Sequence, residues 1–235
     1  MPFLVFQLYG DMASWGDIAV GEQRPILPTP TKSAIIGLIA GSMGIDREND
    51  ADHIALNNSL KIGIQVIKRG GYLTDYHTVQ TATQASLNKK KAYTRKEELA
   101  SGDLNTILSS RDYWISPYYR IAIQCQDNEL LSKILLSLKE PIFTPFLGRK
   151  SCPFSFPLAP QLIECDYFED AINLGGFKLL SHMDFDLTNT EFWWEPNCQS
   201  NLKKSETVTL RTSLESRVRW QFSELQMHVS RNQEG

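Results

Sequence analysis

The sequence predicts an α+β fold with two strand–helix–strand units and a protruding segment between them. The first observation is a run of aliphatic and aromatic residues from Phe3 to Tyr9, which is typical of a strand buried on both faces. The second is the alternation of apolar and polar residues from Leu60 to Lys68 and from Tyr118 to Gln124. The third is a leucine-rich segment from Asn128 to Lys139 that has helical spacing and is followed by Pro141.

Helices are expected between the first two strands. A loop rich in Gly and Pro follows the first strand and leads to Thr31, whose side chain is a good N-cap for a helix from Lys32 to about Met43. A second, short helix is expected from Asp50 to Asn58. These elements complete the first strand–helix–strand unit.

The segment between the two units is expected to leave the core. After the Gly70-Gly71 turn, Tyr72 to Val79 has the pattern of a hairpin arm, whereas Gln80 to Ser110 has few large apolar residues. We therefore expect Gln80 to Ser110 to protrude. With a last short strand expected at Ile142 to Phe146, residues 1–150 have the βαββαβ order of a ferredoxin-like or RRM-like domain whose middle hairpin is enlarged.

Residues 151–235 are predicted to form a smaller, mostly β lobe. Strand-like stretches run from Phe177 to His182, from Thr207 to Arg211 and from Val218 to Val229, and Asp166 to Asn173 has the pattern of a helix. The chain is therefore expected to contain a larger α+β domain followed by this lobe.

Composition limits the class of protein. A formal net charge of −3 does not favour nucleic-acid binding over the whole surface, so any such site must be a local basic patch. The four cysteines are widely and unevenly spaced, which matches neither a metal-binding pair nor a dense disulfide framework. The first residues lack the pattern of a signal peptide, and the longest apolar stretch, Ala34 to Met43, is too short to cross a bilayer. We expect a cytoplasmic protein with reduced thiols and no metal or cofactor.

The sharpest candidate site is the basic segment Gly148-Arg149-Lys150-Ser151. Its glycine lets the backbone approach a ligand closely, and its two cations and hydroxyl suit phosphate groups or unstacked bases. The alternative is an ordinary solvated β-turn. No acidic residue lies between Pro141 and Pro160, and this local positive balance favours nucleic-acid binding.

The start of the first helix is a second candidate. Thr31-Lys32-Ser33 offers free backbone N–H groups and a lysine to an anion, and Arg24 is close enough in sequence to join them. The alternative is a capped helix with an exposed lysine. Trp15, in the preceding loop, is suited either to stacking on a base or to packing beneath the loop, and we favour packing.

The protruding segment carries further candidates. Lys89-Lys90-Lys91 forms a basic run and Arg111 follows at the segment's return, although such runs are often solvated loops. His77 beside Tyr76 is the one place that suggests acid–base chemistry on RNA. A strand-end histidine that hydrogen-bonds within the sheet or touches RNA is the more ordinary interpretation. No motif supports nucleotide or serine-hydrolase chemistry.

Three segments resemble one family. The first starts with Leu8-Tyr-Gly-Asp-Met-Ala-Ser-Trp-Gly16 and continues through Arg24 and Pro30-Thr-Lys-Ser33 to Arg47. The second is Asp75-Tyr-His-Thr-Val79, and the third is Phe143-Thr-Pro-Phe-Leu-Gly-Arg-Lys-Ser-Cys-Pro153. Together they resemble the CasD-type subunits of type I-E CRISPR Cascade complexes, in the RAMP superfamily of RNA-binding proteins. The stretch from about Asn173 onward matches only loosely.

The resemblance implies a non-catalytic subunit that binds the 5′ handle of the guide RNA (crRNA) and caps the backbone filament next to the large subunit. Its partners would be the crRNA, the backbone, large and other Cascade subunits and, indirectly, target DNA, with no membrane involved. The Gln80 to Ser110 segment would be a β-hairpin thumb that presses across the RNA. The expected RNA-binding residues are Trp15, Arg24, Thr31, Lys32, Ser33, His77, Lys89, Lys90, Lys91, Arg111, Gly148, Arg149, Lys150 and Ser151.

The alternative is a metal-independent RAMP endoribonuclease that processes the crRNA precursor. His77 and Tyr76 would then act as the acid–base pair, with Lys32 or Lys150 stabilising charge.

Overall fold

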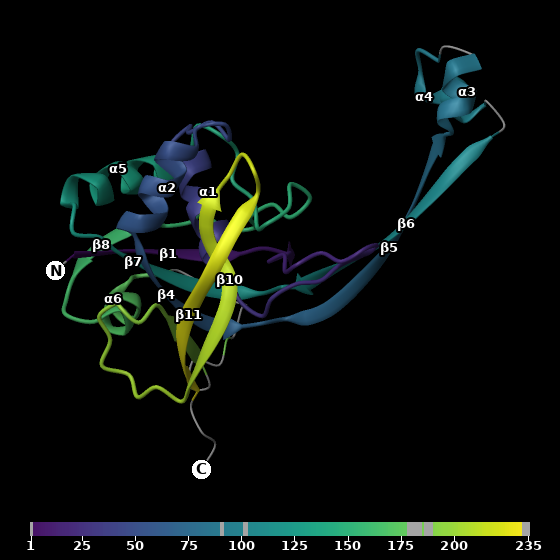
Figure 1. The fold of residues 1–235 in the computed structure, drawn as a ribbon. Coiled ribbons are helices and arrows are strands. Elements are labelled where there is room, and N and C mark those ends of the chain that lie inside the picture. The colour runs from purple at the N-terminus through teal and green to yellow at the C-terminus, as the bar shows by residue number, and fades with distance from the viewer. Residues whose placement is uncertain (1, 90–91, 101–102, 178–184, 186–189, 232–235) are drawn as a thin grey trace.

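The structure, a computed structural model, describes residues 2–89, 92–100, 103–177, 185 and 190–231. A seven-stranded sheet with helices on both faces forms the body, and a long hairpin extends from it (Figure 1). The predicted α+β class is confirmed, with a mostly antiparallel strand arrangement. Among these residues, no helix has both the length and the apolar character needed to span a bilayer.

Four strands form one side of the large sheet, from its middle to one edge: β1 (Pro2–Tyr9), β4 (Lys61–Lys68), β7 (Tyr118–Gln124) and β8 (Gln161–Glu164). They lie in the order β4-β7-β1-β8, and each neighbouring pair is antiparallel. The first three strands lie where the sequence predicted them. β1 is buried on both faces, as expected, because alternate residues pack into two different core clusters.

The C-terminal strands extend the same sheet. β9 (Glu191–Trp194) pairs with β4, and β11 (Gln221–Arg231) and β10 (Glu206–Ser216) follow outward. The strands predicted from Thr207 and from Val218 are present, although β11 starts only at Gln221 because residues 217–220 form the turn. Apart from Phe177, the strand predicted from Phe177 to His182 falls outside the described residues.

Helices cover both faces of the sheet. α1 (Lys32–Ser42), α2 (Asp50–Ser59) and α5 (Asn128–Lys139) lie on one face, and α6 (Phe168–Leu174) lies on the other (Figure 1). All four lie within two residues of their predicted bounds. Thr31 is the N-cap of α1, as predicted, because its Oγ1 accepts a hydrogen bond from the Ala34 amide at 3.1 Å.

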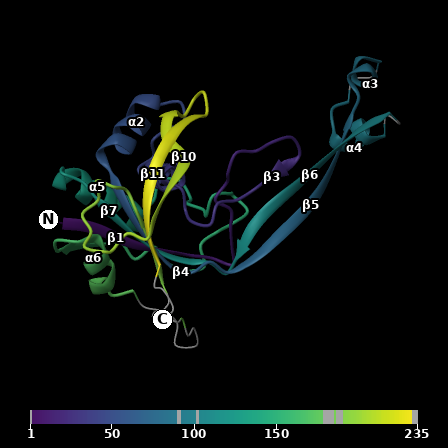
Figure 2. The ribbon, with the colours of Figure 1, turned by 60° about the horizontal axis from the view of Figure 1, so that its bottom comes forward.

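The protrusion is a hairpin of two long strands, β5 (Gly71–Ala82) and β6 (Leu104–Ile115), paired over their whole length. It begins earlier than the predicted segment because Tyr72 to Val79 belongs to it. Figure 2 shows the hairpin reaching away from the body, with short elements at its tip and along its edge. The tip helices are α3 (Gln84–Lys89) and α4 (Arg95–Leu99), and the strands that pair with β6 near its root are β2 (Met12–Ala13) and β3 (Gln23–Arg24).

The strand predicted at Ile142 to Phe146 is wrong. This stretch is irregular, and the strand beside β1 is instead β8. The amide of Ile142 donates to the Ser42 carbonyl at 2.9 Å and that of Phe143 to the Gly41 carbonyl at 3.2 Å, so both bind the end of α1 instead of a strand. Prolines at 141 and 145, which lack an amide hydrogen, also disfavour strand pairing there.

Candidate nucleic-acid interface

The basic segment at Gly148 forms a tight loop held by two buried residues. The Leu147 amide donates to the Cys152 carbonyl at 2.8 Å, and the Cys152 amide donates to the Arg149 carbonyl at 2.9 Å. The side chains of Leu147 and Cys152 are fully buried, and burial raises the pKa of the Cys152 thiol. The loop is therefore anchored in the core and presents Lys150 and Ser151 to solvent.

Gly148 brings this loop against the loop that follows β1. Its φ is +83°, a left-handed conformation, and a Cβ at this position would clash with the Ser14 carbonyl oxygen. The Ser14 amide also donates to the Leu147 carbonyl at 3.0 Å. The glycine thus permits a close approach between two segments of the protein, which fixes the position of the basic loop.

Arg149 connects the loop to the root of the hairpin. Its guanidinium carbon lies 4.8 Å from the centre of the Tyr113 ring on β6, a cation–π contact. Its Nη1 is buried and has no hydrogen-bond partner within the part of the chain that the structure describes. This donor is therefore left without an acceptor inside the protein.

The register of the hairpin places two predicted site residues, His77 and Arg111, on the face that Arg149 covers. Tyr113 is opposite Leu73, Arg111 is opposite Asp75, and Ser109 is opposite His77. Since opposed residues, and every second residue along a strand, share one face, these side chains form one surface. We call it the Tyr113 face, and its members are Leu73, Asp75, His77, Ser109, Arg111 and Tyr113.

β3 adds another cation to this surface. It runs parallel to β6 with Arg24 beside Arg111, so the two side chains point to the same face. The Arg24 guanidinium is exposed and donates to the Gly21 carbonyl at 2.6 Å. Arg24, Arg111 and Arg149 together outnumber Asp75, the acidic residue on this face. The local charge is therefore positive, as a binding site for phosphates requires.

His77 and Tyr76 do not form a shared acid–base site. The His77 Nε2 lies 2.5 Å from a carboxylate oxygen of Asp75 on the same strand. Tyr76 is 62% exposed and, as the adjacent residue in a strand, points to the opposite face of the hairpin. One substrate phosphate therefore cannot be reached by both side chains from the same side.

The start of α1 is turned toward the interior. Lys32 is 5% exposed, and its Nζ lies 2.9 Å from Oε2 of Glu195, whose Oε1 accepts a hydrogen bond from the Ile62 amide at 3.0 Å. Burial lowers the pKa of Lys32 more than Glu195 raises it. Thr31 is also buried, and its Oγ1 lies 3.0 Å from the Ser33 hydroxyl. The alternative of a capped helix with an exposed lysine is wrong as regards the lysine, because its ammonium is paired inside the protein.

Trp15 is also an interior residue. Its side chain is 2% exposed and packs edge-on against Tyr119, with 5.8 Å between ring centres. This is the packing beneath the loop that the sequence favoured, and it leaves no ring face open to a base.

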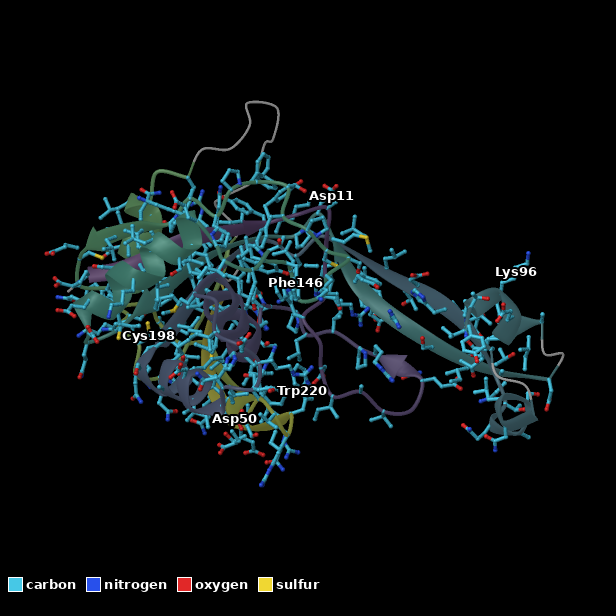
Figure 3. All side chains as sticks on the ribbon, turned by 90° about the horizontal axis from the view of Figure 1, so that it is seen from above. Asp11, Asp50, Lys96, Phe146, Cys198 and Trp220 are labelled. Atoms are coloured by element: carbon cyan, nitrogen blue, oxygen red, sulfur yellow. The ribbon has the colours of Figure 1, made fainter. Side chains whose placement is uncertain are left out.

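The basic run at the tip is only partly described. Lys89 is the last residue of α3, while Lys90 and Lys91 lie outside the described residues. Figure 3 shows Lys96, on α4, at the far end of the hairpin from Phe146, which belongs to the basic loop's segment. The tip and the Tyr113 face are therefore separate surfaces.

The sequence did not reveal Tyr113 as the partner of Arg149, because the pairing depends on how the loop meets the hairpin.

Within residues 2–231, leaving out those not described, no group of three or more His, Cys, Asp or Glu side chains is arranged to hold a metal ion.

Comparisons with known proteins identify the family of this chain. The family described as CRISPR-associated protein (Cas_Cas5) matches residues 3–228. The Escherichia coli K12 protein named CRISPR system Cascade subunit CasD is 29% identical over 168 residues, which cover 66% of this chain and 69% of that protein. A solved chain titled CRISPR RNA-guided surveillance complex superimposes with a TM-score of 0.63 at 21% identity, covering 97% of this chain and 89% of that one. Another, titled Crystal structure of Cas protein, gives the same score and identity over 97% and 94%.

The class is therefore that of the CRISPR-associated proteins, and the structural likenesses show that the fold is shared over almost the whole chain. This chain belongs to the Cas5 family. The predicted resemblance to CasD-type subunits is confirmed.

Proposed function

We propose that this chain is a non-catalytic, crRNA-binding subunit of a type I-E Cascade complex. It binds the 5′ handle of the crRNA and caps the backbone filament beside the large subunit, and so supports RNA-guided recognition of target DNA. Membership of the Cas5 family and the likeness to the Cascade subunit CasD support this assignment. The cytoplasm, where a crRNA-guided complex meets invading DNA, is the proposed location.

The observation that carries the proposal is the stack of Arg149 on Tyr113. It joins the basic loop to the Tyr113 face, so Arg24, Arg111 and Arg149 lie along one surface at the root of the hairpin. Single-stranded RNA is bound by such a combination of phosphate-binding cations and exposed polar groups on a sheet surface. The proposed contacts are Arg24, His77, Arg111, Gly148, Arg149, Lys150 and Ser151, together with Lys89, Lys90 and Lys91.

The other expected residues support this surface from within. Thr31 and Ser33 shape the start of α1, Lys32 is paired with Glu195, and Trp15 packs beneath the loop. Trp15, Thr31 and Lys32 are buried, which excludes their side chains from the proposed interface, and Ser33 is half-buried.

We also propose that the sheet contains a ferredoxin-like βαββαβ unit. The sequence β1, α1, β4, β7, α5, β8 and the spatial order β4-β7-β1-β8 match that arrangement, with β5 and β6 inserted as the thumb. The unit ends at Glu164, at the end of β8, instead of near residue 150. Residues from 165 onward would form the smaller lobe, joined to the unit through β9.

Non-catalytic binding is favoured over RNA cleavage by the geometry at His77. Its partner is Asp75, and Tyr76 lies on the opposite face of the hairpin. A cleavage test separates the two functions. We expect the purified protein to leave repeat RNA intact, and specific cleavage that a 2′-deoxy substitution and His77→Ala both abolish would overturn the assignment.

Charge reversal in the loop tests the interface. The double variant Arg149→Glu/Lys150→Glu should release the crRNA from the assembled complex at lower salt than the wild type does, because two phosphate-binding cations become repulsive. The matched control is Lys133→Glu/Lys139→Glu, which reverses two charges on α5, a helix on the body away from the hairpin (Figure 1). Equal crRNA retention in the wild type and the loop variant would refute the proposed interface.

A further inference from the structure

The turn between β10 and β11 carries a second cationic and aromatic cluster, away from the Tyr113 face. Arg217 and Trp220 lie on this turn, and Arg47 approaches from the segment between α1 and α2. We call these three residues the Trp220 cluster. Trp220 is 55% exposed, and its φ of +57° places it in the left-handed region.

Asp50, the first residue of α2, holds the turn in place. One Asp50 carboxylate oxygen accepts hydrogen bonds from the amides of Arg217 at 2.5 Å and Val218 at 2.9 Å, and the other accepts from the Ser216 hydroxyl at 2.6 Å. These hydrogen bonds hold the pKa of Asp50 below its usual value. Figure 3 shows Asp50 beside Trp220. The cluster is therefore built on a fixed turn instead of a free loop.

Two guanidinium groups stack on the one indole ring. The guanidinium carbon of Arg217 lies 4.4 Å from the Trp220 ring centre, and that of Arg47 lies 5.1 Å from it. Within the described residues, neither arginine forms an ion pair, and the Arg217 Nε is buried with no hydrogen-bond partner. Burial and the neighbouring Arg47 charge both lower the pKa of Arg217.

Two like charges held together beside a buried, unpaired donor are unfavourable unless an anion joins them. Asp50 is near, but its oxygens already accept hydrogen bonds from the turn. An added phosphate or carboxylate that binds the two guanidinium groups would neutralise the pair. The arrangement is thus that of an anion site completed by a ligand.

The exposed indole narrows the choice of anion. A nucleotide offers both a planar base for the Trp220 ring and a phosphate for the two arginines, whereas an acidic side chain uses the arginines alone. Ile142 packs against Gly44, three residues before Arg47 in the chain.

We propose that the Trp220 cluster is a second contact for single-stranded RNA, in which Arg47 and Arg217 bind a phosphate and Trp220 stacks on a base. It is separate from the Tyr113 face and does not require that face to bind RNA.

Fluorescence anisotropy with a fluorescein-labelled RNA of roughly 12 nucleotides tests the proposal on the full chain. Trp220→Ala should weaken binding at least about fivefold, the lower end of base-stacking contributions. Arg47→Gln/Arg217→Gln should reduce the slope of log K against log salt by about 0.7, the contribution of the one phosphate that the two arginines neutralise. The control is Arg219→Gln, which removes a charge from the same turn without a ring contact.

Arg217→Lys distinguishes a lost RNA contact from a folding defect. It keeps the charge, so it should preserve most of the salt slope while losing stacking. If Arg111→Gln weakens RNA binding but the cluster variants behave like Arg219→Gln, the second site is overturned and the proposed function stands. If the cluster variants alone weaken binding, the second site stands and the Tyr113 face fails. Binding of a polyglutamate peptide that depends on Arg47 and Arg217, without any effect of these variants on RNA, would also overturn the proposal in favour of a protein partner.

Discussion

Removing the ammonium of Lys32 should destabilise the fold without touching the RNA surface. Lys32 and Glu195 are both almost fully buried, and each is the other's charged partner at 2.9 Å. In Lys32→Met, the Glu195 carboxylate keeps only the Ile62 amide as a donor. Breaking a buried pair by removing one partner costs about 3–5 kcal/mol, because the remaining charge is desolvated and unpaired.

A second substitution should recover much of that loss. In Lys32→Met/Glu195→Gln the amide oxygen still accepts from Ile62, but no charge is left buried, so we expect a cost of about 1–2 kcal/mol. Lys61→Met, a less buried lysine near Glu195, is the control and should cost less than about 1 kcal/mol.

Urea unfolding followed by circular dichroism measures these differences. With a urea dependence near 3 kcal/mol per M, Lys32→Met should lower the midpoint by about 1 M or more. The folded variant should bind the labelled RNA as the wild type does, within about twofold, since the side chain does not reach the surface. A midpoint unchanged from that of Lys61→Met, or an RNA affinity that falls while the midpoint does not, would refute the burial argument.

The remaining predictions concern the two loops and the Tyr113 face. Gly148→Ala should cost about 1–3 kcal/mol in urea unfolding because its φ is +83° and its Cβ would clash, whereas Gly16→Ala, where a Cβ meets nothing within 4 Å, should be nearly neutral. The pKa of Asp50 is lowered in the folded state, so its stabilising contribution is present above about pH 4 and is lost as pH falls through the lowered folded pKa. The free energies of unfolding of the wild type and of Asp50→Asn should therefore converge in acid, and a constant difference between them down to pH 2 would contradict this. Tyr113→Leu should weaken RNA binding by a few fold, since a cation–π contact contributes about 0.5–1 kcal/mol, and should leave the circular dichroism spectrum unchanged.

The sequence predicted the parts of the fold that local periodicity determines. β7 and α5 have the predicted bounds, because an alternating strand and a leucine-rich helix with an Asp127 N-cap carry strong local signals. It failed at Ile142 to Phe146, where short apolar runs favour a strand but the amides bind the end of α1. No local pattern distinguishes these outcomes, since the partner is about 100 residues away in sequence.

In the candidate site, too, local sequence predicted some features, while others depend on partners far away in the chain. The composition of Gly148 to Ser151 indicated a basic loop, and the loop is present. Whether Lys32 faces solvent could not be predicted, because Glu195, its partner, lies 163 residues later in the chain. The Trp220 cluster was missed for a similar reason. Arg47 and Arg217 meet only when Asp50 holds the β10–β11 turn against α2.

The alternation of side chains at His77 and Tyr76 gives the sharpest test of which hairpin face meets RNA. The two residues are adjacent, so a photo-crosslinking amino acid placed at either position perturbs the same part of β5. We expect crosslinks to crRNA from position 77, which lies on the Tyr113 face, and none or few from position 76, which is 62% exposed on the other face.

Positions 76 and 77 point to opposite faces of the hairpin but lie at nearly the same place along β5. The difference in crosslinking between them is therefore insensitive to how far the RNA extends toward the tip. Crosslinks from position 76 alone would mean that RNA lies on the opposite face, and Arg149 would then have no direct part in binding. Equal crosslinking from both positions would indicate RNA wrapped around the hairpin edge. The open edge of the hairpin is that of β5, because β2 and β3 cover part of the edge along β6. A ligand can pass from one face of the hairpin to the other around a strand whose edge is open.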